Sequence, residues 1–375
     1  MKYVFQIAAI FYGSVLFSQN NYTQFEPGNL WLDDKGVFIN AHGGGFLFHE
    51  GTYYWFGEHK LSGEAGNKAM VGVHVYSSKD LYNWTDGGIA LRINEDTSNL
   101  LQKGCIIERP KVVYNKKNKK FVMWFHHELK DQGYSAALAG IAVSDHVTGP
   151  YRYIHSTRLH KKTFPLNFSK EQMAQVELIQ DRKEANVKQK IFDGAYFKRD
   201  FDAGQMSRDF TLFVDDDETA YHITASEENQ TLLISKLSDD YLSLTKEFIR
   251  AFPGGRNEAP AIFKKDGKYF MFTSDLTGWK PNAARLAVSD DILGDWKFLG
   301  NPCRGSNAEN ATTFISQSTY VIPVMGKKDA YIFAADRWRP ENAIDGRYIW
   351  LPIQFENGYP ILKWFDAWDL SIFDY

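Results

Sequence analysis

Five segments of the chain repeat one pattern of apolar and polar positions. Each segment opens with a polar residue, continues as an apolar run of strand length, and then passes through a short polar turn into an aromatic-rich strand and a third strand. In four of the segments a Ser/Asp turn and a short closing stretch follow. The opening residues are His42, Glu108, Asp209, Glu258 and Gln317.

Repeats of roughly 40–50 residues that contain four short strands are typical of propeller blades. We therefore predict an all-β chain that folds as a single five-bladed β-propeller over residues 20–375. We expect the ring to close by pairing strands from the two ends of the chain, because a propeller otherwise leaves unpaired edges. The opening residue of each innermost strand would face the axis, so acids from distant sequence positions would share one pocket.

The stretch 156–204 interrupts the repeat. It is charged and irregular, and residues 170–190 have a helical composition without Gly or Pro. We predict an insertion between the second and third blades. It could form a wall of the pocket or decorate the rim, and its lack of a chemical motif favours the rim.

The start of the chain has the pattern of an export signal. Met1-Lys2 precede a run that stays apolar to about Phe17, with small residues at Ser14 and Ser18. This predicts a secretory signal peptide over residues 1–18, and hence a periplasmic or secreted protein. The run is too short for a membrane span.

Composition narrows the function classes. Aromatic residues make up 15% of the chain, which suits blades packed face to face and also a sugar site, where flat rings stack on pyranose faces. The net charge is −3 and there is no basic stripe, which argues against nucleic acid as a partner. The two cysteines, Cys105 and Cys303, either form a disulfide, which export permits, or are buried free thiols. The sequence shows no Cys/His cluster of the kind that binds metals, so we predict no metal or cofactor. We also expect the protein to be a monomer.

Two of the opening acids stand where chemistry is expected. Glu108 and Glu258 lie beside apolar strands, where an ionised carboxyl is expensive to bury. Each either pairs with an arginine, Arg109 or Arg256, or has a raised pKa and holds a proton at neutral pH. A raised pKa is what a general acid needs. With Asp209 they would surround one axis, as glycoside hydrolysis requires an acid for the leaving oxygen and a partner for water or the anomeric carbon.

An ordered set of motifs carries a resemblance to a known family. The motifs are Ala41-His42-Gly43-Gly44-Gly45, Tyr53-Tyr54-Trp55-Phe56-Gly57-Glu58, Glu108-Arg109-Pro110-Lys111-Val112, Ser207-Arg208-Asp209, Glu258-Ala259-Pro260, Thr277-Gly278-Trp279, Ser316-Gln317-Ser318 and Trp350-Leu351-Pro352-Ile353. Over almost its whole mature length the chain resembles glycoside hydrolase family 43, and most of all the exo-β-1,3-galactanase branch. The resemblance implies an inverting, exo-acting glycosidase that releases galactose from plant-type β-1,3-galactan or arabinogalactan oligosaccharides.

Catalytic roles are implied by the resemblance. Most family members open blade one with an aspartate that acts as base, whereas here, as in the galactanase branch, His42 and glycines occupy that stretch. The resemblance implies that Glu258 is the general acid and that Gln317 is the base through its imidic tautomer. Because an amide is a poor base, Gln317 needs a proton relay or a neighbouring carboxylate. Glu108 would supply it by positioning or polarising the amide.

The resemblance also implies residues that bind the sugar. Asp209 would hold hydroxyl groups and help to set the pKa of Glu258. Glu58 and Trp279 would shape the terminal-galactose subsite, Trp279 by stacking. Trp279 could instead pack within a blade, and Glu58 could be a turn acid.

Three further residues are candidates for sugar binding. Tyr134 and Asn229 are implied by the same match. His42 lies at the axis end of blade one, where a neutral imidazole could hydrogen-bond an acid. A metal role for His42 has no second ligand that the sequence can name.

Two alternatives remain open. One is another family 43 activity, that of an α-L-arabinofuranosidase, β-galactofuranosidase or β-xylosidase. The other is a non-catalytic carbohydrate-binding propeller, which the loss of the usual blade-one aspartate would predict. The polar residues retained at the start of the other four segments favour the enzyme.

Overall fold

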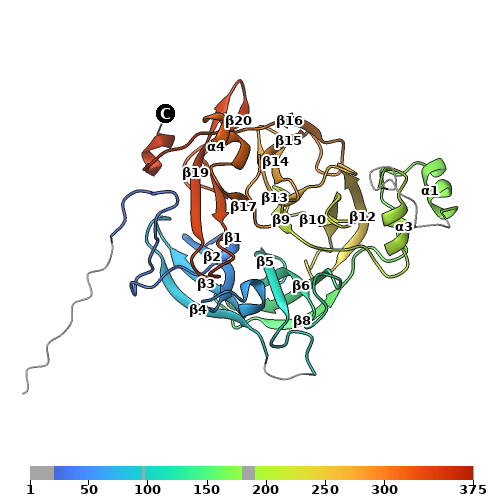
Figure 1. Ribbon diagram of the computed structural model, residues 1–375, viewed down its shortest axis with the longest axis horizontal. Helices are drawn as coiled ribbons and strands as arrows, with labels where there is room; N and C mark the ends of the chain where they lie inside the picture. The colour runs from blue at the N-terminus through green and yellow to red at the C-terminus, as the bar shows by residue number, and fades with distance from the viewer. Residues whose placement is uncertain (1–20, 95–97, 180–190, 375) are drawn as a thin grey trace, which may run out of the picture.

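The computed structural model describes residues 21–94, 98–179 and 191–374. Its strands form five four-stranded antiparallel sheets, which stand as blades around a central axis (Figure 1). The prediction of an all-β, five-bladed propeller is therefore confirmed. The first strand of each blade lies nearest the axis (Figure 1).

Each blade contains four strands that are consecutive in the sequence. Blade one contains β1 (His42–His49), β2 (Thr52–Lys60), β3 (Met70–Ser78) and β4 (Thr85–Arg92). Blade two contains β5 (Ile106–Asn115), β6 (Lys120–Glu128), β7 (Leu138–Ser144) and β8 (Arg152–Thr157). Blade three contains β9 (Phe210–Val214), β10 (Ala220–Ser226), β11 (Thr231–Leu237) and β12 (Leu244–Ala251). Blade four contains β13 (Glu258–Lys265), β14 (Lys268–Ser274), β15 (Arg285–Ser289) and β16 (Lys297–Gly300). Blade five contains β17 (Gln317–Pro323), β18 (Tyr331–Arg337), β19 (Arg347–Glu356) and β20 (Tyr359–Leu362).

The helices are short. Those with bounds inside the described part of the chain are α1 (Lys170–Glu177), α3 (Ala195–Asp200) and α4 (Asn307–Thr312), with the 3-10 turns η1 (Gly66–Ala69) and η2 (Leu370–Phe373).

The aromatic-rich second strands fill the spaces between blades. In β2, Trp55 packs against Trp350 of blade five, with ring centroids 5.1 Å apart. The next residue, Phe56, joins the apolar cluster with Met123 of blade two. Because successive side chains of a strand point to opposite faces, one such strand supplies both interfaces of its blade.

Ring closure differs from the expectation. Within the described residues, no blade combines strands from the two ends of the chain. A bridge pair, Phe25 and Trp368, joins the ends instead, and Trp368 Nε1 donates to Trp350 O at 2.9 Å. The expected pairing of early and late chain is therefore present only as this bridge outside the blades, and aromatic packing between blades one and five holds the junction of the ring.

The predicted insertion lies outside the ring. Between β8 and β9 the chain forms α1 and α3 at the outer edge of blade three, beyond β12 (Figure 1). Phe197 of α3 packs against Phe248 of β12. Helix α1 covers the start of the stretch predicted to be helical, and residues 180–190 lie outside the described part.

The remaining predictions concern the start of the chain and the two cysteines. The predicted signal peptide, residues 1–18, lies outside the described residues. Among the described residues, the helices are all too short or too polar to cross a bilayer. Cys105 and Cys303 are buried free thiols and form no disulfide.

A bulge follows the opening residue in three of the innermost strands. The bulges interrupt the ladder between β1 and β2, β5 and β6, and β13 and β14. The residues directly after the openers have left-handed φ values of 61° at Gly43, 55° at Arg109 and 51° at Ala259. Because a bulge adds a residue and re-aims the side chains around it, two successive residues can reach the same end of the axis.

Candidate active site

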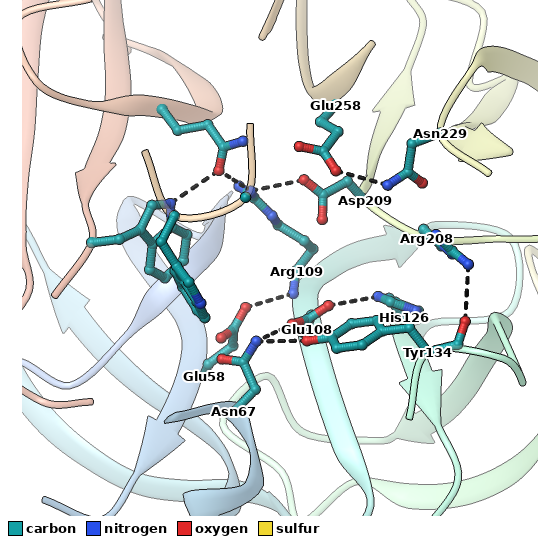
Figure 2. Close-up of a pocket in the computed structure, with 14 residues that line it drawn as sticks. Glu58, Asn67, Glu108, Arg109, His126, Tyr134, Arg208, Asp209, Asn229 and Glu258 are labelled. Carbon is teal, nitrogen blue, oxygen red and sulfur yellow. Dashed lines mark hydrogen bonds and ion pairs between the residues drawn. The ribbon is translucent and has the colours of Figure 1, made fainter. Parts of the chain in front are cut away.

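A pocket of about 280 Å³ opens at the axis, where the innermost strands begin (Figure 2). Its lining comes from all five blades. The lining residues that the sequence indicated are Glu58, Glu108, Tyr134, Asp209, Asn229, Glu258, Trp279 and Gln317. The lining residues that it did not assign to the site are Asn67, Arg109, His126, Arg208, Gly278 and Trp338.

Glu258 starts β13 and faces Asp209 and Asn229 (Figure 2). Asn229 Nδ2 donates to Glu258 Oε1 at 2.7 Å. Burial, followed by the negative charge of Asp209, raises the pKa of Glu258 to about 8. Arg256 instead pairs with Asp275 at 3.3 Å. Of the two outcomes considered for this acid, the structure therefore gives the protonated one, which can donate a proton.

Glu108 has the opposite character. Its Oε1 accepts from Asn67 and from Tyr134 Oη, the latter at 2.6 Å, and its Oε2 lies 2.8 Å from His126 Nδ1. Burial would raise the pKa of Glu108, but the hydrogen bond and charge of His126 outweigh it and lower the pKa. Burial likewise opposes protonation of His126, yet its bonds to Glu108 and Glu128 raise that pKa to about 9. Glu108 is thus an ionised carboxylate at the pH where Glu258 is neutral.

Arg109 connects blade two with blades three and five. Its Nη2 donates to Asp209 Oδ2 at 2.9 Å and to Gln317 Oε1 at 2.6 Å. Its Nη1 donates to Ser318 O at 3.0 Å. Pairing with Glu108, one of the alternatives drawn from the sequence, does not occur among the described residues, because Arg109 extends across the axis.

Gln317 has its amide fixed at both ends. Its Oε1 accepts from Arg109 and from Trp338 Nε1, the latter at 3.0 Å, and its Nε2 donates to Ser274 Oγ at 3.0 Å. Both donors to Oε1 lack any acceptor capacity, so they favour the amide over an imidic acid whose oxygen carries a proton. No bond to Glu108 occurs among the described residues. Contrary to the expectation, the group that polarises Gln317 is Arg109.

Acids hold the bulges across the blade interfaces. In three cases a carboxylate accepts the backbone N–H of a bulge residue in the next blade. The bonds run from Gly43 N to Asp336 at 2.6 Å, from Arg109 N to Glu58 at 2.9 Å and from Ala259 N to Asp209 at 3.2 Å. Glu58 also pairs with Lys60 at 2.6 Å and is 1% exposed. Glu58 therefore borders the pocket while both of its oxygens are engaged by the protein.

Aromatic residues border one side of the pocket. Trp279 is 42% exposed, and its ring meets that of Trp338 edge-on with centroids 5.6 Å apart. The guanidinium of Arg109 lies 5.4 Å from the Trp338 ring. Trp279 is thus placed to stack on a sugar and is not a blade-core residue.

His42 lies behind the pocket and does not line it. Its ring is 1% exposed and stacks on Tyr348 with centroids 5.0 Å apart. Burial, helped by the charge of Lys60, lowers the pKa of His42 to about 3. The imidazole is neutral, as expected, but it makes no hydrogen bond to an acid within the described residues.

One group of side chains has the composition of a metal site. Glu108, His126 and Asp209 offer ligand atoms that lie within 4.8 Å of one another. His126, however, is held between Glu108 and Glu128 at 2.8 Å from each. Its raised pKa gives this cluster a cation of its own, so the donor set does not fit a divalent ion well, and we assign it no metal.

Several solved structures are similar to this chain over almost its whole length. The family model for glycosyl hydrolases family 43 matches residues 193–358. A solved family 43 β-1,3-galactosidase with galactodeoxynojirimycin is 51% identical, with a TM-score of 0.87, and the match covers 92% of this chain and 100% of that one. No curated protein matches significantly.

Two exo-β-1,3-galactanases are also similar. The enzyme from Clostridium thermocellum is 32% identical, with a TM-score of 0.74 over 92% of this chain and 66% of that one. The enzyme from Phanerochaete chrysosporium, solved with β-1,3-galactotriose, is 30% identical, with a TM-score of 0.73 over 92% of this chain and 68% of that one.

Proposed function

The chain belongs to glycoside hydrolase family 43, and we propose that it releases galactose, with inversion, from the non-reducing ends of β-1,3-galactan in arabinogalactan. The observation that carries the proposal is the neutral acid Glu258 beside ionised Glu108 in a pocket of about 280 Å³. Two carboxyl groups whose pKa values are driven apart are what glycosidases use to assign acid and stabilising roles. The similar proteins supply the choice of sugar, because their names specify β-1,3-galactosidase and exo-β-1,3-galactanase.

In this proposal a terminal galactose fills the pocket and stacks on Trp279. Glu258 gives its proton to the glycosidic oxygen as the bond breaks. The ionised carboxylate of Glu108 stabilises the positive charge that develops on the sugar ring as the bond breaks. Asn229 holds the acid in place.

Gln317 serves the attacking water in this scheme. Its oxygen already accepts two hydrogen bonds, so it cannot take a proton from water without losing one of them. Its Nε2 donates one bond, to Ser274, and has a second hydrogen for a water molecule. We therefore assign Gln317 to the orientation of water. The proton that the water loses as it attacks passes to the ionised carboxylate of Glu108, which balances the proton that Glu258 gives to the leaving oxygen.

The cellular setting is also part of the proposal. The basic and apolar start of the chain supports export to the periplasm or the medium, where plant polysaccharide is met. All five blades that form the pocket come from one chain, which supports a monomer as the active unit.

The test is to incubate the protein separately with β-1,3-galactan, arabinan and xylan and to identify the released sugars. We expect galactose from the first substrate and little from the others. Proton NMR of the earliest product should show α-galactose, because inversion of a β-linkage gives the α-anomer. Release of arabinose or xylose would replace the substrate assignment, and an early β-anomer would refute inversion.

A further inference from the structure

A turn of three residues presents the partner of the catalytic acid. Glu227, Glu228 and Asn229 follow β10 and have left-handed φ values of 51°, 58° and 61°. Residues other than glycine adopt this conformation rarely, and a run of them persists only where the surroundings hold it. The last of the three, Asn229, makes the hydrogen bond to Glu258. The placement of that bond therefore depends on what holds the turn.

The first support is a buried ion pair. Arg250 donates to both oxygens of Glu227, at 2.6 and 2.7 Å, and the two residues are 5% and 0% exposed. Arg250 also donates to Ile191 O at 2.9 Å, and its guanidinium lies 5.1 Å from the ring of Phe168. Ile191 and Phe168 belong to the insertion, so the insertion completes the site that holds this pair.

The second support comes from a charged side chain of the insertion itself. Arg199 of α3 donates to Glu228 Oε1 at 2.8 Å, and Arg208 donates to Glu228 Oε2 at 2.7 Å. Arg199 is oriented by two bonds to Asp200, at 2.9 and 2.7 Å. Arg208 lines the pocket and also donates to Tyr134 O at 2.9 Å. Glu228 thus links the insertion to the pocket wall.

We propose that the insertion, although it lies on the outer edge of the ring, holds the turn 227–229 in its left-handed conformation and so positions Asn229 against Glu258. Arg199 and Arg250 are then positioning residues for the acid step. The inference deepens the proposed function and rests on it for its meaning in catalysis. It gives a role to a segment whose described residues contribute no side chain to the pocket.

The expected signature follows from the groups that face Glu258. The charged ones are Asp209 and Glu108, which raise its pKa, and Arg109, which lowers it. The hydrogen bond from Asn229 also lowers it. A displaced Asn229 would therefore leave Glu258 with a higher pKa and a less fixed carboxyl.

Two variants separate displacement from a simple charge effect. Arg199→Gln removes a positive charge and Glu228→Gln removes a negative one, so a through-space field would shift the Glu258 pKa in opposite directions. Loss of positioning raises it in both. The pKa is read by carbon-13 NMR titration of glutamate-labelled protein, with the signal assigned through Glu258→Gln. Lys162→Gln is the control, since Lys162 is an exposed residue of the insertion that faces Asp202 at 3.9 Å.

Kinetics give a second reading. On galactan, Arg199→Gln and Glu228→Gln should each lose on the order of tenfold in kcat/KM, as expected for a misplaced catalytic group. On an aryl galactoside with an acidic phenol, which needs little protonation, the loss should be smaller. Arg250→Lys keeps the charge but not the two-bond geometry, so it should raise the pKa as well and serves if another variant does not fold.

Folded variants whose Glu258 pKa stays unchanged, or shifts in opposite directions, would overturn the proposal. A wild-type protein that cleaves no galactan would count against the proposed function alone. In that case a rise of the pKa in Arg199→Gln and Glu228→Gln would still support the positioning role.

Discussion

The acid role of Glu258 can be tested by one substitution, Glu258→Gln, which keeps the shape of the side chain but removes the proton. Its pKa, raised from 4.5 to about 8, leaves about 97% of the side chains protonated at pH 6.5, against about 1% without the shift. At this pH the wild type therefore uses the full contribution of general acid catalysis. That contribution is typically about 10²–10⁴-fold, or about 2.7–5.4 kcal/mol of transition-state stabilisation.

The assay compares two substrates. β-1,3-Galactobiose has a poor leaving group, so Glu258→Gln should lose about 10²–10⁴-fold in kcat/KM on it. An aryl β-galactoside with an acidic phenol leaves without protonation, and the variant should keep most of its activity there. Glu247→Gln, at an exposed site on β12, is the matched control and should behave as wild type on both. An equal loss on the two substrates would remove Glu258 from the acid role.

Three further outcomes are expected. Asp209→Asn removes a charge that raises the pKa of Glu258, so the alkaline limb of the kcat/KM profile should move to lower pH, and an unmoved limb would contradict the coupling. Since the pKa of His126 is raised from 6.5 to about 9 by its acids, Glu108 among them, its stabilisation is complete below pH 6.5 and is lost as the pH rises through 9. Denaturation between pH 6 and 10 should therefore show a smaller loss of stability in His126→Asn than in wild type, and equal losses would count against the ion pair. Trp368→Ala should cost about 3–5 kcal/mol of unfolding free energy in urea titrations. An unchanged unfolding free energy would show that this residue does not help to close the ring.

The sequence was sufficient for the fold because the repeat is periodic at the level of single strands. Trp55 and Phe56 sit at adjacent positions of an aromatic-rich strand, and their alternation already indicates two buried faces. Glu108 and Glu258 could be placed around one axis because each opens the first strand of its repeat. Ring closure could not be predicted, because it depends on aromatic packing between residues about 300 positions apart, such as Trp55 and Trp350.

The part of the site that the sequence did not reveal lies next to the openers. Strict alternation would send Arg109 away from a pocket that Glu108 faces, but the bulge brings both to the axis. His126 is opposite Glu108 in the register of β5 and β6, so a polar residue near the end of a second strand was a usable signal. Asn67 lies on η1, outside any strand pattern, and had no such signal.

The pairing of Phe25 with Trp368 has a consequence for how the chain can be rewired. It holds the first and last described segments side by side, while every blade is complete within one continuous stretch of sequence. The order of the blades along the chain can therefore be changed without changing their order around the ring. A short linker would join the segments of Phe25 and Trp368, and a cut between blades two and three would leave all four-stranded sheets intact. A circular permutant of this kind would begin at β9, and Glu258 from its second blade and Glu108 from its last blade would still meet at the axis.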